Sequence, residues 1–469
     1  MTETTTYKHV KLEPFDVKYV EHVKISSKIN KHTEAEITAL LPGEGKDALI
    51  YNTGIGTIVK VSCEHDDSGY LFIGVVKKIK IKAVQNNYYL IIKALSETSK
   101  MDVKRKCRSF QDKSETYRQI IDGITGEYPQ GGVIDTASDG KTTEKFLMQY
   151  EETDWQYVMR LCSLHNAGLV PAHKNEGVKY FFGIPEGENR GNLEQYNFTT
   201  AKLVTQYLRE KENENPDITE LDKVYFEVET GEFFNIGDSV SYQDASLRVN
   251  QSVIEIKKSV VRCTYRLTTK KGCSKETFYN DKIIGLSIKG NVIKTEKDEI
   301  KLHLNIDESQ DVGKAHFFRH TTMYTASGNS GLYCMPELGD TLYAHFPTKK
   351  EWEGVTQNSI RDKENGGDKI SDPDTKYWRT KNGKEIKLDP KEMLLTCVDD
   401  ETYIKLNEDG GISIFSVKPI KITTMEDLNI ESQKNINMTA KDEITLTCKS
   451  STIKMDGNIL IKGKEVRHN

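Results

Sequence analysis

The sequence predicts a mainly β chain with a few helices that ends in an intertwined trimeric β-helix. Short stretches of alternating apolar and polar residues, such as VKVSC (59–63) and NYYLIIKAL (87–95), are typical of strands with one buried face. From Ile404 onwards, apolar residues recur in i, i+2 pairs at a fixed spacing of eight residues. Alternation over most of the chain predicts the β class, and the fixed spacing predicts the C-terminal β-helix.

Six consecutive pairs keep this spacing, and all twelve positions are apolar in a chain that is 36 % hydrophobic. Polar residues dominate the positions between the pairs, and the register slips by one residue after the sixth pair, to Ile453 and Met455. We predict that the twelve residues form the core of the β-helix: Ile404, Leu406, Ile412, Ile414, Ile420, Ile422, Leu428, Ile430, Ile436, Met438, Ile444 and Leu446.

The length of the repeat indicates how many chains share this core. An i, i+2 step places both side chains on one face of a strand. Eight residues give only a short strand, a bend and a second short strand, so one chain has no wall opposite its own apolar pairs. Three chains wound together supply three walls and leave no free sheet edges along the shaft. An ordinary alternating sheet is the alternative, but it requires no fixed period over six repeats.

Composition and charge exclude several classes of function. With 66 basic and 71 acidic residues and a net charge of −5, the chain has no surplus charge for binding nucleic acid or an anionic membrane. We find neither a signal peptide nor an apolar run of transmembrane length, so we expect synthesis in the cytoplasm. The eight cysteines include no CxxC pair, which favours reduced, structural thiols over a metal site.

Helices are expected in the N-terminal half. Ser114 is predicted to cap a helix over 114–125, and Thr153 with Gln156 has capping-box spacing ahead of a helix over 155–164. Another helix is expected over 198–211.

Two further features have simple structural interpretations. His165 could serve as a ligand or a base, but a histidine at a helix boundary is the simpler interpretation. Residues 354–376 are polar, contain Gly-Gly and Asp-Pro-Asp, and are predicted to be a linker or a long loop.

Several segments, in this order along the chain, resemble the VgrG proteins of type VI secretion and the related hub-and-spike proteins of contractile phage tails. The similar segments are SFQDKSETYRQIIDGI (109–124), QYEETDWQYVMRLCSLHNAGLVPA (149–172), KYFFGIP (179–185), GLYCMPELGDTLYAHFP (331–347) and KYWRTKNGKEIKLD (376–389). Each segment alone is moderately specific, and their common order is the stronger argument.

The resemblance implies a hub of two β-barrel-like domains with a helical insertion, followed by an OB-fold and a needle. The implied domains are hub barrel 1 at 1–110, a helical or α+β insertion at 111–215, hub barrel 2 at 216–280, an OB-fold collar at 281–352, a linker with the strand into the needle at 353–385, and the triple-stranded β-helix at 386–469. About 35 residues separate the collar from the needle, too few for the lysozyme domain that some phage relatives carry there.

Some related spikes bind a metal at the tip through a His-x-His motif, which this chain lacks. His468 is the single candidate ligand here, and a frayed terminus is the alternative interpretation. We expect no cofactor other than a metal ion at this position, and no catalytic residues. The chain ends with the needle, so we also expect no fused effector domain.

By resemblance, the function is structural. We expect a homotrimer that caps the tail tube at the baseplate, contacts tube and baseplate proteins, and pierces the target cell envelope when the sheath contracts. A separate PAAR-like tip protein is a further expected partner, and the assembled particle acts outside the cell. Two alternatives are a tail-associated cell-wall hydrolase and a trimeric fibre that binds glycans or receptors. The acidic groups Asp399–Glu401 and Glu151–Glu152 are interpreted as solvated charges rather than catalytic pairs.

Overall fold

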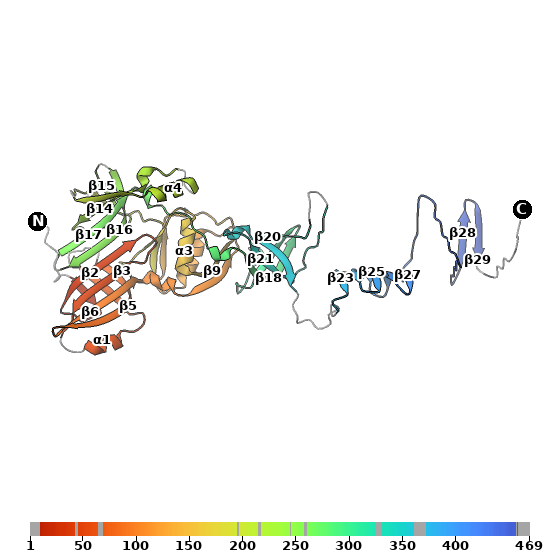
Figure 1. The fold of residues 1–469 in the computed structure, drawn as a ribbon, viewed down its shortest axis with the longest axis horizontal. Coiled ribbons are helices and arrows are strands. Elements are labelled where there is room, and N and C mark those ends of the chain that lie inside the picture. Colours follow the sequence, from red (N-terminus) through yellow and green to blue (C-terminus); the bar gives the residue numbers. More distant parts are fainter. Residues whose placement is uncertain are drawn as a thin grey trace. The chain divides into compact units, whose positions relative to one another are not determined.

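We analysed a computed structural model of the chain, which describes residues 10–42, 46–63, 69–194, 197–213, 217–243, 245–257, 260–324, 330–360, 372–455 and 457. The chain divides into two compact units, Met1–Asp362 and Lys363–Asn469. Each unit is built mainly of strands, so the predicted β class is confirmed (Figure 1).

The first unit is dominated by one 12-stranded sheet that includes strands from both predicted hub barrels. β2 pairs antiparallel with β16, with Ile25 opposite Ile254, and so joins segments more than 200 residues apart. The apolar faces of these strands form the largest core cluster. The strands are β1 (Val10–Glu13), β2 (Tyr19–Lys28), β3 (Glu34–Leu40), β4 (Ile58–Cys63), β5 (Tyr70–Val84), β6 (Asn87–Ser96), β12 (Asn189–Asn192), β13 (Phe198–Lys202), β14 (Val224–Thr230), β15 (Ser239–Tyr242), β16 (Ala245–Lys257) and β17 (Val260–Thr268).

An insertion with its own core lies between the two halves of this sheet in sequence. Its helices are α2 (Tyr117–Gly126) and α3 (Asp154–Ser163), and its strands are β7 (Arg105–Phe110), β8 (Gly132–Asp135), β9 (Leu147–Thr153), β10 (Leu169–Pro171) and β11 (Lys179–Phe182). The remaining helices of the unit are α1 (Lys46–Asn52), α4 (Val204–Asn213), and the 3₁₀ turns η2 (Glu97–Asp102), η3 (Glu220–Lys223), η4 (Lys271–Cys273), η5 (Asp281–Ile283) and η6 (Glu351–Glu353).

A closed five-stranded barrel follows, as the OB-fold prediction requires. Its strands are β18 (Leu286–Glu296), β19 (Glu299–Leu304), β20 (Phe317–His320), β21 (Thr341–Phe346) and β22 (Val355–Ile360). Residues 355–360 were expected to belong to the linker, but they pair with β20 and β21 and close the barrel. The polar sequence misled the prediction because two of these six residues are exposed and three are half-buried, while the polar Thr356 is the fully buried one.

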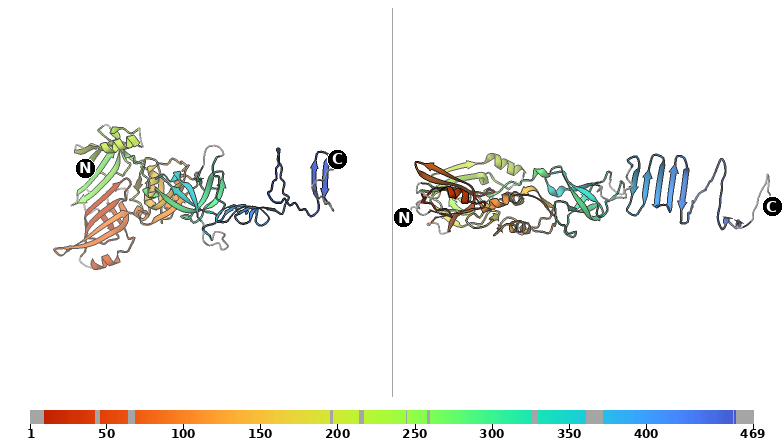
Figure 2. Two further views of the ribbon diagram at one scale, coloured as in Figure 1. Left: turned by 45° about the vertical axis from the view of Figure 1, so that its right-hand side comes forward. Right: turned by 90° about the horizontal axis from the view of Figure 1, so that it is seen from below.

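The second unit begins with a five-stranded antiparallel meander, visible as side-by-side blue strands in the right-hand view of Figure 2. Its strands are β23 (Lys376–Arg379), β24 (Glu385–Leu388), β25 (Glu392–Val398), β26 (Thr402–Asn407) and β27 (Gly411–Ser416). A hairpin of β28 (Ile444–Cys448) and β29 (Ser451–Met455) follows, and residues 417–443 form no strand in the single chain.

The helix predictions are correct in part. Thr153 and Gln156 form the predicted capping box of α3. Thr116, not Ser114, caps α2, because its hydroxyl accepts the Gln119 backbone N–H while the Ser114 hydroxyl donates to Asp112. The helix expected over 198–211 begins only at Val204, since 198–202 pairs with β14 as β13.

Candidate assembly site

The meander of the second unit presents one apolar face. Residues directly opposite on antiparallel strands share a face of the sheet. The register aligns six apolar side chains in two rows: Leu395, Ile404 and Ile414 in one, and Met393, Leu406 and Ile412 in the other. Ile386 lies opposite Leu395, and Trp378 lies opposite Ile386, so both extend the row that contains Leu395. The eight-residue spacing therefore brings successive pairs into register across neighbouring strands.

No part of the single chain covers this face in the described structure. Of the twelve predicted core residues, all except Ile444 are exposed, and Ile412 and Ile414 keep 73 % and 62 % of their surface. The exposure continues through the pairs of 417–443. So many exposed apolar pairs at a regular spacing are far beyond the isolated exposed aliphatics of an ordinary monomer surface.

Local turn chemistry explains why each eight-residue repeat of the meander is one strand and one reversal. The side-chain oxygen of Asn407 accepts hydrogen bonds from the backbone N–H groups of Asp409 and Gly410, and Gly411 has a φ of +72°. The sequence predicted a short strand, a bend and a second short strand within each repeat. In 402–416 each repeat instead forms one strand, because the Glu-Asp-Gly-Gly sequence reverses the chain direction fully.

The opposite face of the meander is held by ion pairs. Arg379 donates to Asp399 at 2.8 Å and to Glu385 at 2.7 Å, and these two carboxylates raise its pKa. These contacts link β23 and β24 to the turn after β25 and fix the alignment of the apolar rows on the other side. Asp399, interpreted from sequence as a solvated charge, is therefore part of an ion pair.

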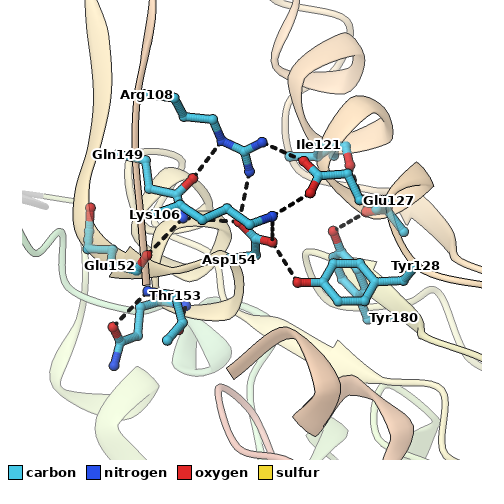
Figure 3. A network of polar contacts seen from close by, with 12 residues as sticks. Lys106, Arg108, Ile121, Glu127, Tyr128, Gln149, Glu152, Thr153, Asp154 and Tyr180 are labelled. Carbon is cyan, nitrogen blue, oxygen red and sulfur yellow. Dashed lines mark hydrogen bonds and ion pairs between the residues drawn. The ribbon is translucent and has the colours of Figure 1, made fainter. Parts of the chain in front are cut away.

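The insertion contains a buried polar network at the start of α3 (Figure 3). Asp154 is fully buried and accepts hydrogen bonds from Lys106 at 2.6 Å, Arg108 at 2.7 Å and the Tyr128 hydroxyl at 2.6 Å. Gln149 donates to it at 3.0 Å. Glu127 bridges the two basic side chains on their outer side. The network ties β7, β9, α2 and α3 together around one carboxylate.

Loss of the Asp154 charge should destabilise the protein at neutral pH. Burial raises the pKa of Asp154, but the hydrogen bonds from Lys106, Tyr128 and Gln149 and the charge of Arg108 outweigh burial and lower it. A lowered pKa means that the ionised network stabilises the fold above 3.8, the ordinary pKa, and that this contribution disappears as the pH falls through the lower folded-state value. We expect Asp154→Asn to lose about 2–4 kcal/mol of unfolding free energy at pH 7. The deficit relative to wild type should shrink in acid.

Urea denaturation at pH 7 and at about pH 2, below the folded-state pKa, measures both effects, and Asp122→Asn on the exposed face of α2 is the matched control, with a change below about 0.5 kcal/mol. An Asp154→Asn deficit that is the same at both pH values would contradict the assignment.

A second buried cluster joins the insertion to the five-stranded barrel. Arg160 of α3 is 1 % exposed and donates to both carboxylate oxygens of Glu152, at 2.9 and 2.8 Å. It also donates to Glu351 of η6 at 2.7 Å, and Glu351 is fully buried. Lys145 lies 3.8 Å above the neighbouring Trp352 ring. This guanidinium group is one of several links between the insertion and the barrel.

The comparisons with known proteins bear on the fold. A family model described as the Alg8 N-terminal domain matches residues 16–179, less than half of the chain. No curated protein matches the sequence. Among solved structures, the E. coli c3393 protein, a component of the type VI secretion system with structural similarity to the T4 bacteriophage tail proteins gp27 and gp5, superposes with a TM-score of 0.55. At 12 % identity, the match covers 75 % of this chain and 99 % of that one.

Chains of the Francisella PdpA–VgrG complex give a TM-score of 0.53 in its lidded form and 0.52 in its lidless form, each at 10 % identity. These matches cover 86 % of this chain and 79 % of the other in the first case, and 84 % and 93 % in the second. The chain has the hub-and-spike fold. The likeness confirms the predicted mainly β hub architecture at the level of the fold.

Sequence reasoning missed the buried charges of this hub-and-spike fold. Glu152 was interpreted as solvated, yet it is 8 % exposed and bound to Arg160. Glu152, Asp154 and Arg160 all lie in the segment 149–172 that carries the resemblance. A basic residue eight positions after an acidic one, inside an otherwise apolar helix face, is the signal that could have indicated the pair.

His165 lies just beyond α3 and packs edge-on against Tyr117, with ring centroids 4.5 Å apart. Burial lowers its pKa, which favours the neutral boundary histidine over a base. In the described residues, no cluster of histidine, cysteine or acidic side chains could hold a metal, and none of the helices is long and apolar enough to cross a membrane. His468 lies outside the described residues.

Proposed function

We propose that this chain is the hub-and-spike subunit of a contractile injection machine. In this proposal it acts as a homotrimer that caps the tail tube at the baseplate and pierces the target envelope when the sheath contracts. Its work is mechanical, and no residue breaks a bond. The chain is synthesised in the cytoplasm, is assembled into a tail-like particle and acts outside the cell. The similarity in fold to type VI and phage tail proteins supports this proposal.

The uncovered apolar face of the second unit is the observation that carries the proposal. Burial of one large aliphatic side chain contributes about 1.5–3 kcal/mol. Leaving Ile412, Ile414 and the following pairs in water is therefore unfavourable, and two further copies of the same chain offer the same rows at the same eight-residue spacing. If each of three chains contributes a third of the shared core, every apolar row faces a row from another chain. The three single-layer sheets then form one closed shaft.

A shaft of this kind suits a needle because its strands are bonded on both sides and its interior is dry. Force applied along it must break three chains together rather than one strand at a time. We further propose the tube protein and baseplate proteins as partners of the hub, and a PAAR-like protein as a partner at the tip, where His468 is the candidate ligand for a metal ion.

The mass in solution tests the assembly. At neutral pH and micromolar concentration, size-exclusion chromatography with light scattering should give three times the 53.4 kDa chain mass. A chain shortened to end at residue 371, before β23, should be a monomer at the same concentration, because it lacks the apolar rows. A monomeric mass for the full chain would contradict the proposal. An identical trimer in the shortened chain would show that the chains associate through the first unit instead of the apolar rows.

A further inference from the structure

A small, partly open pocket in the first unit is lined by more basic than acidic side chains. It has a volume of about 130 Å³, several times that of one water molecule. Its walls come from three places: the sheet strands β2, β14, β16 and β17, the start of α4, and the turns η3 and η4 with the residues that follow. The side chains that matter are Lys28, Lys223, Asn250, Arg266 and Lys275.

Two of these cations have no carboxylate partner in the part of the chain that the structure describes. Neither Lys28 nor Lys275 forms an ion pair or a side-chain hydrogen bond there. Lys275 is partly buried, and burial lowers its pKa, as do the neighbouring charges of Lys223 and Lys28. A third cation, Arg266, contacts an acid only at 3.5 Å, to Glu227, and its buried Nε has no hydrogen-bond partner.

The acids near the pocket are already engaged. Glu210 pairs with Lys223 at 2.6 Å, and both side chains are 2 % exposed. Asp222 accepts hydrogen bonds from the hydroxyls of Thr219 and Thr269, at 2.8 and 2.6 Å. The Lys223–Glu210 pair is neutral overall, and Asp222 and Glu227 supply two negative charges against Lys28, Arg266 and Lys275. About one positive charge is therefore uncompensated. Lys28 is exposed, so the cost falls on the partly buried Lys275 unless an anion enters.

The orphaned side-chain oxygen of Asn250 fits the same explanation. It is buried without a partner. A half-turn of the amide exchanges oxygen for NH₂ and directs a donor into the pocket, which an anion would select.

We propose that this pocket binds a small tetrahedral oxyanion of the phosphate class. The donors stand on three walls, an arrangement that matches four oxygens around one centre better than the flat carboxylate group. Bound there, the anion neutralises Lys275 and Arg266 and fastens α4 and the η4 turn to the large sheet. The proposal is independent of the needle, since all of its residues lie in the first unit.

Thermal unfolding of the full chain in sodium phosphate and in sodium chloride at equal ionic strength tests the proposal. Phosphate at ten times its dissociation constant should raise the Tm of the wild type by about 2–5 °C, because it binds only the folded state. Acetate at the same ionic strength should have no such effect. Lys275→Met should lose the phosphate response and should also melt higher than wild type in chloride, because the uncompensated cation is gone.

Lys289→Met, which removes an exposed lysine on β18, is the matched control and should keep the full phosphate shift. Arg266→Gln is the second pocket variant, and ³¹P NMR line broadening of inorganic phosphate by the native protein measures binding directly. Equal Tm values in phosphate and chloride, an equal shift in acetate, or line broadening that persists in both pocket variants would each overturn the proposal.

Discussion

Replacing Ile414 by aspartate should prevent the chain from forming a trimer. The side chain lies in the apolar row of β27, opposite Ile404, and is 62 % exposed in the single chain. Three wound chains would bring three copies of it into one dry layer. The substitution removes about 1.5–3 kcal/mol of burial per chain and adds three unpaired carboxylates, so the trimer loses well over about 5 kcal/mol. The dissociation constant should rise by a factor of roughly 1,000 or more.

Ser413→Asp is the matched control for Ile414→Asp. Ser413 is the preceding residue on the same strand, is exposed, and lies on the opposite face, paired with Lys405. The substitution introduces the same charge one residue away on the same strand, but on the face opposite to the apolar row. Sedimentation velocity should give a trimer for this variant and a monomer for Ile414→Asp. Two trimers would show that the apolar row does not face a shared interior.

Local sequence signals predicted the local structure well. The capping box at Thr153 and Gln156 and the strand alternation of β4 and β6 depend on residues within a few positions of one another. The eight-residue repeat was equally visible, because its period and the strand face are both local properties. Ser114 failed as a cap because Thr116, two residues later, has the same hydroxyl chemistry and a better-placed Gln119.

Long-range contacts could not be predicted in this way. The pairing of β2 with β16 has no counterpart in the residues around either strand. The same holds for Arg160 and Glu351, which are 191 positions apart and meet only because the barrel packs against α3. A carboxylate in a single sequence does not reveal whether it is solvated, and the solvated interpretation of Glu152 failed for that reason. The pocket around Lys275, with its surplus positive charge, could not be predicted for the same reason, because its lining residues come from segments that only the fold brings together.

Replacing Arg160 by methionine should loosen the connection between the insertion and the barrel. Methionine has a comparable length but no charge, so Glu152 and Glu351 would remain buried without their shared cation. One oxygen of Glu351 already lacks a hydrogen-bond partner. Removal of one member of a buried ion pair typically costs about 3–5 kcal/mol. We expect that loss in the unfolding free energy, together with faster hydrogen exchange in 346–353.

Two further variants separate the charge effect from a general effect of substitution. Arg118→Met breaks the exposed pair with Asp122 on α2, whose side chains are 42 % and 48 % exposed, and should cost less than about 0.5 kcal/mol. Glu351→Gln retains an acceptor for Arg160 and removes one of the two negative charges, so it should cost less than Arg160→Met. If Arg160→Met were as mild as Arg118→Met, the guanidinium would not hold the barrel to the insertion. The hydrogen bonds of Ser109 with Asp307 and the packing of Phe146 in the barrel core would then hold the two parts together.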